Sequence, residues 1–302
     1  MTSMSASTKL TVLITGCSPG GAGAALATAF HNAGHQVYAS GRDLAKLLPL
    51  EGLGIHTVAL DITSASSIAD AVASVSSHLP TGKGLDVLVN NAAGSYTMPI
   101  VDISLLESKA LFDLNVWSQI AVTQAFLPLL LQASSSPDST SMIVNHTSVG
   151  SVTALPFQGV YNASKAAFAM LSETMRMELA VFRVRVIELK TAGVDTNIIS
   201  NNNVNRKADK LPQGSIYEPA REVVEKAMSQ EGLTDKGIPP DQWASEVMSL
   251  LLSGNPPAVI WKGKSASIAH VASMIPCNMF EGMMKKMTKL NVVEEIILEH
   301  RK

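Results

Sequence analysis

The stretch Leu10-Thr11-Val12-Leu13-Ile14, followed by Thr15-Gly16-Cys17-Ser18-Pro19-Gly20-Gly21-Ala22-Gly23, decides the fold. Its first five residues are apolar or β-branched, which predicts a buried strand, and the alanine-rich segment 22–30 predicts a helix. Glycines at such a turn let the backbone approach a pyrophosphate closely, and the start of the helix offers free N–H groups and a favourable dipole. We therefore expect a dinucleotide to bind at this turn.

The alternation of strand and helix continues along the chain. Further strands are expected at 36–40, 55–60, 86–89, 142–145, 184–189 and 258–261, and helices at 65–78, 111–132, 161–182, 218–229 and 240–252. Short apolar strands separated by helices predict a parallel sheet that is covered on both faces. The expected fold class is therefore α/β, with a single Rossmann-type doubly wound parallel sheet of about seven strands.

The domain organisation follows from the same pattern, because no linker or repeat divides the chain. We expect one domain over residues 1–302, with its core at 8–262. The polar composition of the segment that follows Thr196 predicts a substrate lid at 196–240, since long polar stretches inside a compact domain are usually loops or lids. Residues 263–302 are expected to form an apolar, helical carboxyl-terminal extension.

Composition argues against several classes of function. Charged residues make up 16% of the 302 residues and the net charge is −2, which gives no broad attraction to nucleic acid. Cys17, Cys277 and the 7 histidines show no metal-ligand spacing, so we expect no metal. Residues 1–9 lack an apolar signal core and no window of about eighteen residues is continuously apolar, so we expect a cytoplasmic protein without a spanning helix.

Tyr161 and Lys165 stand four residues apart on an expected helix, and hence on the same face of it. A cation beside a phenol favours the phenolate and lowers the pKa of the tyrosine from its usual value near ~10. Such a pair can pass a proton to or from a carbonyl or alcohol oxygen. Ser148 follows the expected strand 142–145 and adds a hydroxyl. These three residues are the candidate catalytic site.

The ends of the second and third expected strands indicate which dinucleotide binds. The second strand ends Ala39-Ser40-Gly41-Arg42, without an acid at its tip to take the ribose hydroxyls. Arg42 together with Ser40 can hold a 2′-phosphate, which favours NADP over NAD. Asp43 is expected to cap the next helix, whereas Asp61 is a candidate both for the adenine amino group and for the cap of the helix that begins near Ser64.

The turn 15–23, Asn90-Asn91-Ala92, Asn115, Ser148 and the Tyr161/Lys165 pair together resemble the short-chain dehydrogenase/reductase family over residues 8–262. Phe157, the run Tyr161-Asn162-Ala163-Ser164-Lys165-Ala166-Ala167 and the long carboxyl-terminal extension are similar to its fungal NADPH-dependent 1-acyldihydroxyacetone-phosphate reductase-like branch. The resemblance implies that Tyr161 gives the proton, Lys165 lowers its pKa and holds the nicotinamide ribose, Ser148 orients the substrate oxygen, and Asn115 supports a water relay to Lys165.

The resemblance also implies an NADP(H) site. Its residues are Gly16, Ser18, Gly21, Ala22, Gly23, Ser40, Arg42, Asp61, Asn91, Ala92, Tyr161, Lys165, Val194 and Thr196. Three departures from the family pattern bear on individual contacts. The glycine turn is one residue longer, so Gly21 and Gly23 are expected at the phosphate-facing places; Ala93 is an extra residue; and Thr191-Ala192 replaces the usual Pro-Gly.

The resulting hypothesis is an NADPH-dependent ketoreductase or alcohol dehydrogenase for a bulky, largely apolar carbonyl compound. A lipid-derived keto-phosphate and a secondary-metabolite ketone are both consistent with it. Two alternatives stay open. Gly16-Cys17-Ser18-Pro19-Gly20 matches G-x-S-x-G, the nucleophile elbow of serine esterases and lipases, with Ser18 as the nucleophile. The other alternative is a redox-neutral or nucleotide-sensing member of the family.

Substrate choice is expected from the lid and from the apolar extension. The extension carries Ile268, Val271, Met274, Ile275, Met279, Phe280, Met283 and Met284, with Lys285, Lys286 and Lys289 beside them. Apolar and basic residues in one segment also make it a candidate for peripheral contact with an intracellular membrane. By resemblance, helices 111–132 and 161–182 pair in a homodimer or homotetramer.

Overall fold

The computed structural model describes residues 9–302 except 137, 198–209, 231–236 and 276. Within these residues one sheet contains seven strands in the order β3-β2-β1-β4-β5-β6-β7, all paired in parallel. The strands are β1 (Thr11–Ile14), β2 (Gln36–Gly41), β3 (His56–Ala59), β4 (Val87–Asn90), β5 (Ser141–Ser148), β6 (Val184–Thr191) and β7 (Val259–Lys262). The predicted fold class and its seven strands are confirmed.

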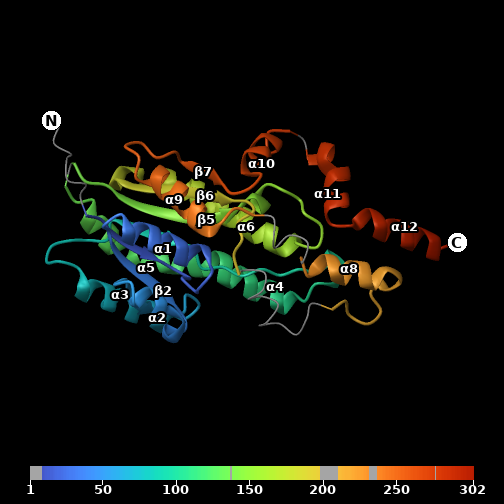
Figure 1. Ribbon diagram of the computed structural model, residues 1–302, viewed down its shortest axis with the longest axis horizontal. Helices are drawn as coiled ribbons and strands as arrows, with labels where there is room; N and C mark the ends of the chain where they lie inside the picture. The colour runs from blue at the N-terminus through green and yellow to red at the C-terminus, as the bar shows by residue number, and fades with distance from the viewer. Residues whose placement is uncertain (1–8, 137, 198–209, 231–236, 276) are drawn as a thin grey trace.

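Helices cover both faces of the sheet, as Figure 1 shows. On one face, α1 (Ala22–Asn32) packs against α9 (Pro240–Leu251), with Phe30 and Trp243 in the core between them and the sheet. On the other face lie α3 (Ala65–His78), α5 (Ser118–Ala133) and α6 (Gly159–Leu179), with Phe126 buried beneath them. Burial on both faces explains why the strands are continuously apolar rather than alternating. A short 3₁₀ turn (Leu44–Leu47) and α2 (Leu48–Glu51) follow β2, where Asp43 was expected to cap a helix but no helix bounds were predicted.

The helix predicted at 111–132 is in fact three consecutive pieces. These are α4 (Leu105–Phe112), a π-helical turn (Asp113–Trp117) and α5. A π turn accommodates one extra residue and is often found at functional sites. By length and composition Leu105–Ala133 could cross a membrane, but half of its most apolar window is buried inside the protein. This run therefore serves as a core helix against the sheet.

The carboxyl-terminal extension consists of α10 (Ala266–Ala272), a 3₁₀ turn (Cys277–Phe280), α11 (Glu281–Met287) and α12 (Leu290–His300). In Figure 1 it leads away from β7 to the far right of the molecule, where α12 lies beyond α8 (Arg221–Met228). α12 packs against α8 and the preceding 3₁₀ turn (Glu218–Ala220), and it buries Val293 beside Val224 and Met228. Of the lid predicted at 196–240, residues 198–209 and 231–236 lie outside the described residues.

Candidate active site

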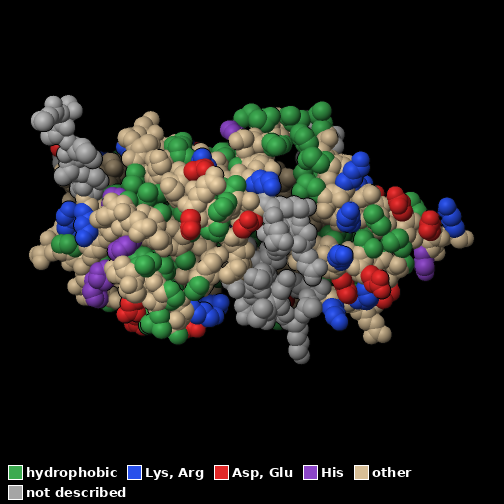
Figure 2. Space-filling model, viewed as in Figure 1, with side chains coloured by type: hydrophobic (Ala, Val, Ile, Leu, Met, Phe, Trp, Pro, Cys, Tyr) green, Lys and Arg blue, Asp and Glu red, His purple; other side chains and the backbone are tan. Residues whose placement is uncertain are grey.

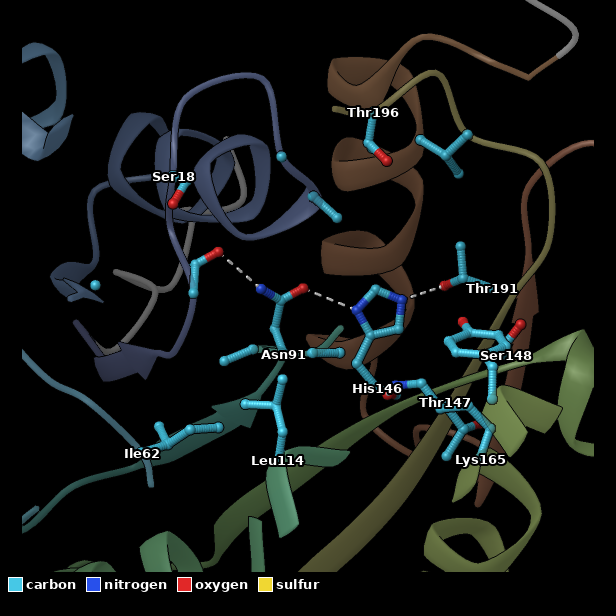
Figure 3. Close-up of a pocket in the computed structure, with 18 of the residues that line it drawn as sticks. Ser18, Ile62, Asn91, Leu114, His146, Thr147, Ser148, Lys165, Thr191 and Thr196 are labelled. Carbon is cyan, nitrogen blue, oxygen red and sulfur yellow. Dashed lines mark hydrogen bonds between the residues drawn. The ribbon is translucent and has the colours of Figure 1, made fainter. Parts of the chain in front are cut away.

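A cavity of about 330 Å³ lies at the carboxyl ends of the strands. The strand order reverses between β1 and β4, and ligands of open α/β sheets bind at such a switch point. Most of the predicted site residues meet here, and Figure 3 shows several of them around the cavity. Its lining includes Gly16, Ser18, Gly21, Ala22, Arg42, Asp61, Asn91, Ala92, Ser148, Tyr161, Lys165, Val194 and Thr196. Of the predicted residues, Gly23, Ser40 and Asn115 are not part of this lining.

The glycine turn is shaped by close backbone contacts. Gly16 has φ +73°, and a Cβ atom there would lie 2.7 Å from the Cα of Ala92, so only glycine fits without strain. Gly21 caps α1 and lines the cavity together with Ala22. Gly23, expected to face the phosphates, instead packs α1 onto the turn, because a Cβ there would lie 2.5 Å from Asn91 Nδ2 and 2.6 Å from the Gly16 oxygen.

The polar residues at the end of β2 differ in where their side chains lie relative to the cavity. Arg42 is exposed at the cavity rim, as expected for a group that could hold a phosphate. Ser40 does not share this place: it is fully buried and its hydroxyl donates to the carbonyl of Ile14 at 3.2 Å. This hydrogen bond holds the Ser40 hydroxyl against β1 and away from the cavity. Asp43 caps the 3₁₀ turn that follows, accepting from the amide of Ala45 at 3.0 Å.

Asp61 lines the cavity after β3 but does not cap α3. Its Oδ1 accepts from the Thr63 hydroxyl at 2.7 Å and from the Thr63 amide at 3.0 Å. These two hydrogen bonds lower the pKa of Asp61, and the cation of Arg42 lowers it further. The cap of α3 is Ser64, which accepts from the amide of Ser67. An ionised carboxylate is thus presented to the cavity.

Ser148, Tyr161 and Lys165 come together from two elements. Ser148 ends β5, and Tyr161 and Lys165 lie near the start of α6. Lys165 is buried; its Nζ donates to the carbonyl of His146 at 2.9 Å and lies 6.0 Å from the centre of the Tyr161 ring. Burial lowers the pKa of Lys165 to about 8. The ammonium is therefore still the major form at neutral pH.

The pKa of Tyr161 departs from the sequence-based expectation. We predicted that Lys165 would lower it, whereas burial raises it and a hydrogen bond with Ser148 lowers it by a smaller amount. The physical reason is that the enclosed ring loses the hydration that would stabilise a phenolate, while the ammonium lies over the ring. Tyr161 consequently keeps its proton at neutral pH.

Asn115 sits in the π turn and is almost completely buried. Its Oδ1 accepts from the Gly94 amide at 2.9 Å, and its Nδ2 donates to the Gly94 carbonyl at 3.0 Å and to the Ser164 hydroxyl at 3.1 Å. The side-chain amide is thus used to tie the loop after β4 to α6, one residue before Lys165. Its expected part in a water relay stays a prediction.

Sequence reasoning missed His146 and the role of Thr191, both of which line the cavity. One ring nitrogen of His146, Nδ1, lies 2.9 Å from Asn91 Oδ1, and the other, Nε2, lies 2.6 Å from Thr191 Oγ1. Burial, with a smaller effect from the Lys165 cation, lowers the pKa of His146 to about 3. The two-residue period of a strand puts His146 on the same side as Ser148, and this signal could have found it.

The arrangement around Ser18 does not favour the esterase alternative. A serine hydrolase needs a histidine that is free to take the proton of the nucleophile. The histidine of this cavity, His146, has both ring nitrogens engaged with Asn91 and Thr191. Ser18 instead belongs to the glycine turn that lines the cavity beside α1.

Residues 10–207 match the short chain dehydrogenase family. The chain belongs to the short-chain dehydrogenase/reductase family. A short-chain dehydrogenase/reductase from Pestalotiopsis microspora is 47% identical over 289 residues, which cover 96% of this chain and 97% of that protein. The NADPH-dependent 1-acyldihydroxyacetone phosphate reductase of Schizosaccharomyces pombe is 34% identical over 286 residues, which cover 92% of this chain and 94% of that protein.

The fold of the family is shared by solved structures. A short-chain dehydrogenase from Streptomyces avermitilis superposes with a TM-score of 0.74 at 24% identity, covering 95% of this chain and 98% of that one. This likeness supports the fold. The family assignment makes this short-chain dehydrogenase/reductase an oxidoreductase that uses NAD or NADP, and the resemblance drawn from the glycine turn and the Tyr161/Lys165 pair is confirmed at the family level.

Proposed function

We propose that this short-chain dehydrogenase/reductase is an NADPH-dependent ketoreductase, or alcohol dehydrogenase in the reverse direction, for a bulky and largely apolar carbonyl compound. One observation carries the proposal: Ser148, Tyr161 and Lys165 line the same cavity as the glycine turn after β1. A proton donor and a cradle for a dinucleotide therefore share one space. The family membership of the chain supports the same chemistry.

The residues of the cavity fit a dinucleotide phosphate. Gly16 lets the glycine turn pack closely against Ala92, which keeps the backbone of the turn at the wall of the cavity. No side chain caps the start of α1 at Gly21, so the first amides of this helix can receive an anion. Arg42 offers a guanidinium to a 2′-phosphate at the exposed rim. The NADPH dependence named for the Schizosaccharomyces pombe relative supports NADP as the cofactor.

In the proposed mechanism a bound nicotinamide supplies the hydride, and the residues of this chain supply the proton and stabilise charge. Tyr161 gives its proton to the carbonyl oxygen as negative charge develops there, and its raised pKa keeps that proton in place beforehand. Ser148 donates a hydrogen bond to the same oxygen. Lys165, held by the carbonyl of His146, stabilises the phenolate that remains. Asn115 holds α6 in place through Ser164.

The substrate class follows from the apolar cluster that Tyr161 packs against. Tyr96, Met98, Phe157, Leu211 and Val224 are among its buried residues, and α12 adds Val293. Apolar surroundings on this side of Tyr161 support a large apolar group next to the reacting carbonyl. We propose an acylated keto-phosphate or a secondary-metabolite ketone as the substrate, and the Schizosaccharomyces pombe relative supports the first of these.

The test of this function compares two tyrosines. Oxidation of NADPH is followed with a panel of bulky ketones, including an acylated dihydroxyacetone phosphate. In Tyr161→Phe turnover should fall by about 10²–10⁴-fold, because the acid is removed. Tyr38→Phe is the matched control, since Tyr38 is a buried phenol on β2 that bonds Gln36 and should leave turnover unchanged. Ordinary turnover in Tyr161→Phe would refute the mechanism, and saturable NADPH binding without oxidation would favour a nucleotide sensor.

We also propose a homodimer formed through α5 and α6. Apolar side chains stand exposed along this layer: Trp117, Met170, Met177, Val181 and Phe182. Met170 and Met177 lie seven residues apart and hence on one side of α6, and Val181 follows in the 3₁₀ turn (Ala180–Phe182) at the end of this helix. Light scattering tests the proposal; a dimer mass that falls to the monomer mass in Met177→Asp supports it, and a monomeric wild type refutes it.

A further proposal concerns the extension, which we propose contacts an anionic membrane surface. Figure 2 shows hydrophobic side chains gathered at the upper edge of the molecule, over α10 and α11. Ile268, Val271, Met274 and Met279 are exposed there, and Lys286 and Lys289 are exposed beside them. Flotation with phosphatidylserine vesicles tests this contact. Binding that is lost in Met274→Asp is the expected result, and absence of wild-type binding overturns it.

A further inference from the structure

Three polar side chains form a continuous chain of hydrogen bonds across the carboxyl edge of the sheet, which Figure 3 shows with dashed lines. Asn91, after β4, reaches the glycine turn through Nδ2, which lies 2.7 Å from the Thr15 carbonyl and 3.1 Å from the Gly16 carbonyl. His146 on β5 connects Asn91, at 2.9 Å, to Thr191 at the end of β6, at 2.6 Å. The ends of β1, β4, β5 and β6 are thereby joined.

The direction of every hydrogen bond in this chain can be assigned from chemistry. The two carbonyls at the glycine turn only accept, so the NH₂ group of Asn91 must face them and its Oδ1 must face His146. Oδ1 also only accepts, so Nδ1 of His146 carries the proton. The ring of a neutral histidine then has a bare Nε2, which accepts from the hydroxyl of Thr191.

The consequence concerns the face that Thr191 turns to the cavity. Its single hydroxyl proton is committed to His146, so Thr191 can offer only lone pairs to a bound molecule. We propose that His146 is a positioning residue that makes Thr191 a hydrogen-bond acceptor for the carboxamide N–H of the nicotinamide. The inference rests on the proposed NADP(H) function of the cavity. Asn91, His146 and Thr191 are all half-buried.

Three observations support the assignment. The ring of His146 stacks on the buried Trp243 with their centres 5.3 Å apart and their planes at 21°, so the ring cannot turn freely. The lowered pKa of His146 keeps the ring neutral, as the assignment requires. An imidazolium would instead donate from Nε2 to Thr191. The hydroxyl of Thr191 would then be free to donate its proton to a molecule in the cavity, so Thr191 would act as a donor there rather than as an acceptor. Thr191 also stands where the family pattern has a proline, which has no hydroxyl and could not make this hydrogen bond.

The experiment measures discrimination between two dinucleotides. NADP and its 3-acetylpyridine analogue differ in that the analogue has a methyl group where the carboxamide has its NH₂. Dissociation constants come from titration calorimetry. The wild type should bind NADP about tenfold more tightly than the analogue, the effect of one hydrogen bond that leaves its partner unpaired when lost. In Thr191→Val this ratio should fall to near one, whereas Thr191→Ser, which keeps the hydroxyl, should retain it.

The variant His146→Phe tests the positioning role, because phenylalanine keeps the stacking on Trp243 but removes both hydrogen bonds. In His146→Phe the ratio of the two affinities, for NADP and for the analogue, should fall to near one, as in Thr191→Val. A wild-type ratio in both variants overturns the inference. A wild type that binds neither dinucleotide would instead refute the proposed function, so the two failures are distinguishable.

A second measurement is independent of any ligand and of the folding of the variants. In the ¹⁵N-labelled wild-type protein at neutral pH, the ring of His146 should show its proton on Nδ1 and a bare Nε2. A proton on Nε2 would overturn the assignment of Thr191 as an acceptor. If His146→Phe does not fold, the pair Thr191→Val and Thr191→Ser together with this spectrum still decides the question.

Discussion

Two regions are held in place in different ways. One is the edge of the sheet around the glycine turn, and the other is the carboxyl-terminal extension. At the edge, Asn91, His146 and Asn115 use their polar atoms on backbone and side-chain partners from several elements. In the described part of the extension, only Ala266 and Val293 are buried, and many apolar side chains, such as Met274 and Met279, are exposed.

This difference indicates which region of the molecule must hold its atoms in exact positions. Directional hydrogen bonds between buried groups fix atoms to one arrangement, because an unmade bond is costly. Apolar contacts are not directional, and flexible methionine side chains adapt to different shapes. We infer that the sheet edge holds the cofactor and the reacting groups, while the extension and α8 adapt to the substrate. The predictions below test this division.

The largest effect is expected at the glycine turn. In Gly16→Ala the new Cβ would lie 2.7 Å from the Cα of Ala92, so the turn must move, and affinity for NADPH should fall by at least about 100-fold. Gly82→Ala is the matched control, because Gly82 has a similar φ of +77° but open space around it. It should lose about 1–2 kcal/mol of stability and no affinity. Calorimetry of both variants measures the effect, and equal losses of affinity would contradict a role for close packing.

The next effect concerns Arg42 and the choice between NADPH and NADH. Removing a charge-assisted contact to the 2′-phosphate in Arg42→Ala should reduce the preference for NADPH about 10–100-fold. Lys46→Ala removes another exposed cation of the same region and should leave the preference as it is. The ratio of kcat/KM for the two cofactors is the measurement. An unchanged ratio in Arg42→Ala would place the selectivity elsewhere.

The stability of the fold should also depend on pH, because His146 at the hydrogen-bonded edge of the sheet is neutral in the folded protein. His146 has a pKa of about 3 in the folded protein and 6.5 as its ordinary value, so below pH 6.5 the unfolded chain binds a proton that the folded chain does not. Stability is therefore lost as the pH falls through this range. Between pH 7 and pH 5 the wild type should lose on the order of 2 kcal/mol more than His146→Phe. Urea unfolding at both pH values measures the difference, and parallel losses would argue against a buried neutral ring.

The smallest effect is expected in the extension. In Val293→Asp an uncompensated charge enters the apolar cluster against α8, which should loosen α12. KM for a bulky ketone should then rise several-fold, which corresponds to about 1 kcal/mol of binding free energy. Leu298→Asp changes an exposed residue of the same helix and is the control. Affinity for NADPH should stay at the wild-type value in both. A loss of NADPH affinity in Val293→Asp would show that the two regions are not independent.

Much of this protein could be predicted from local sequence alone. Short continuous apolar runs locate the strands, because this sheet is buried on both faces. Most helices are located by apolar residues that recur every third to fourth position. The glycines after β1, the Tyr161/Lys165 pair and Ser148 indicated the family and its chemistry. Asp43 was correctly predicted as a cap, since a cap depends on neighbours only two residues away.

Tertiary structure alone decided the properties that depend on partners far along the chain. The pairing of His146 with Thr191 joins residues 45 positions apart and follows from the parallel register of β5 and β6. Ser40 turned to Ile14 rather than to a phosphate, and Gly23 toward Asn91, because the packing of β2 and α1 on β1 fixes their directions. The raised pKa of Tyr161 has the same origin. Spacing shows which charges are near in the chain, whereas only the folded protein determines how much water each group has lost.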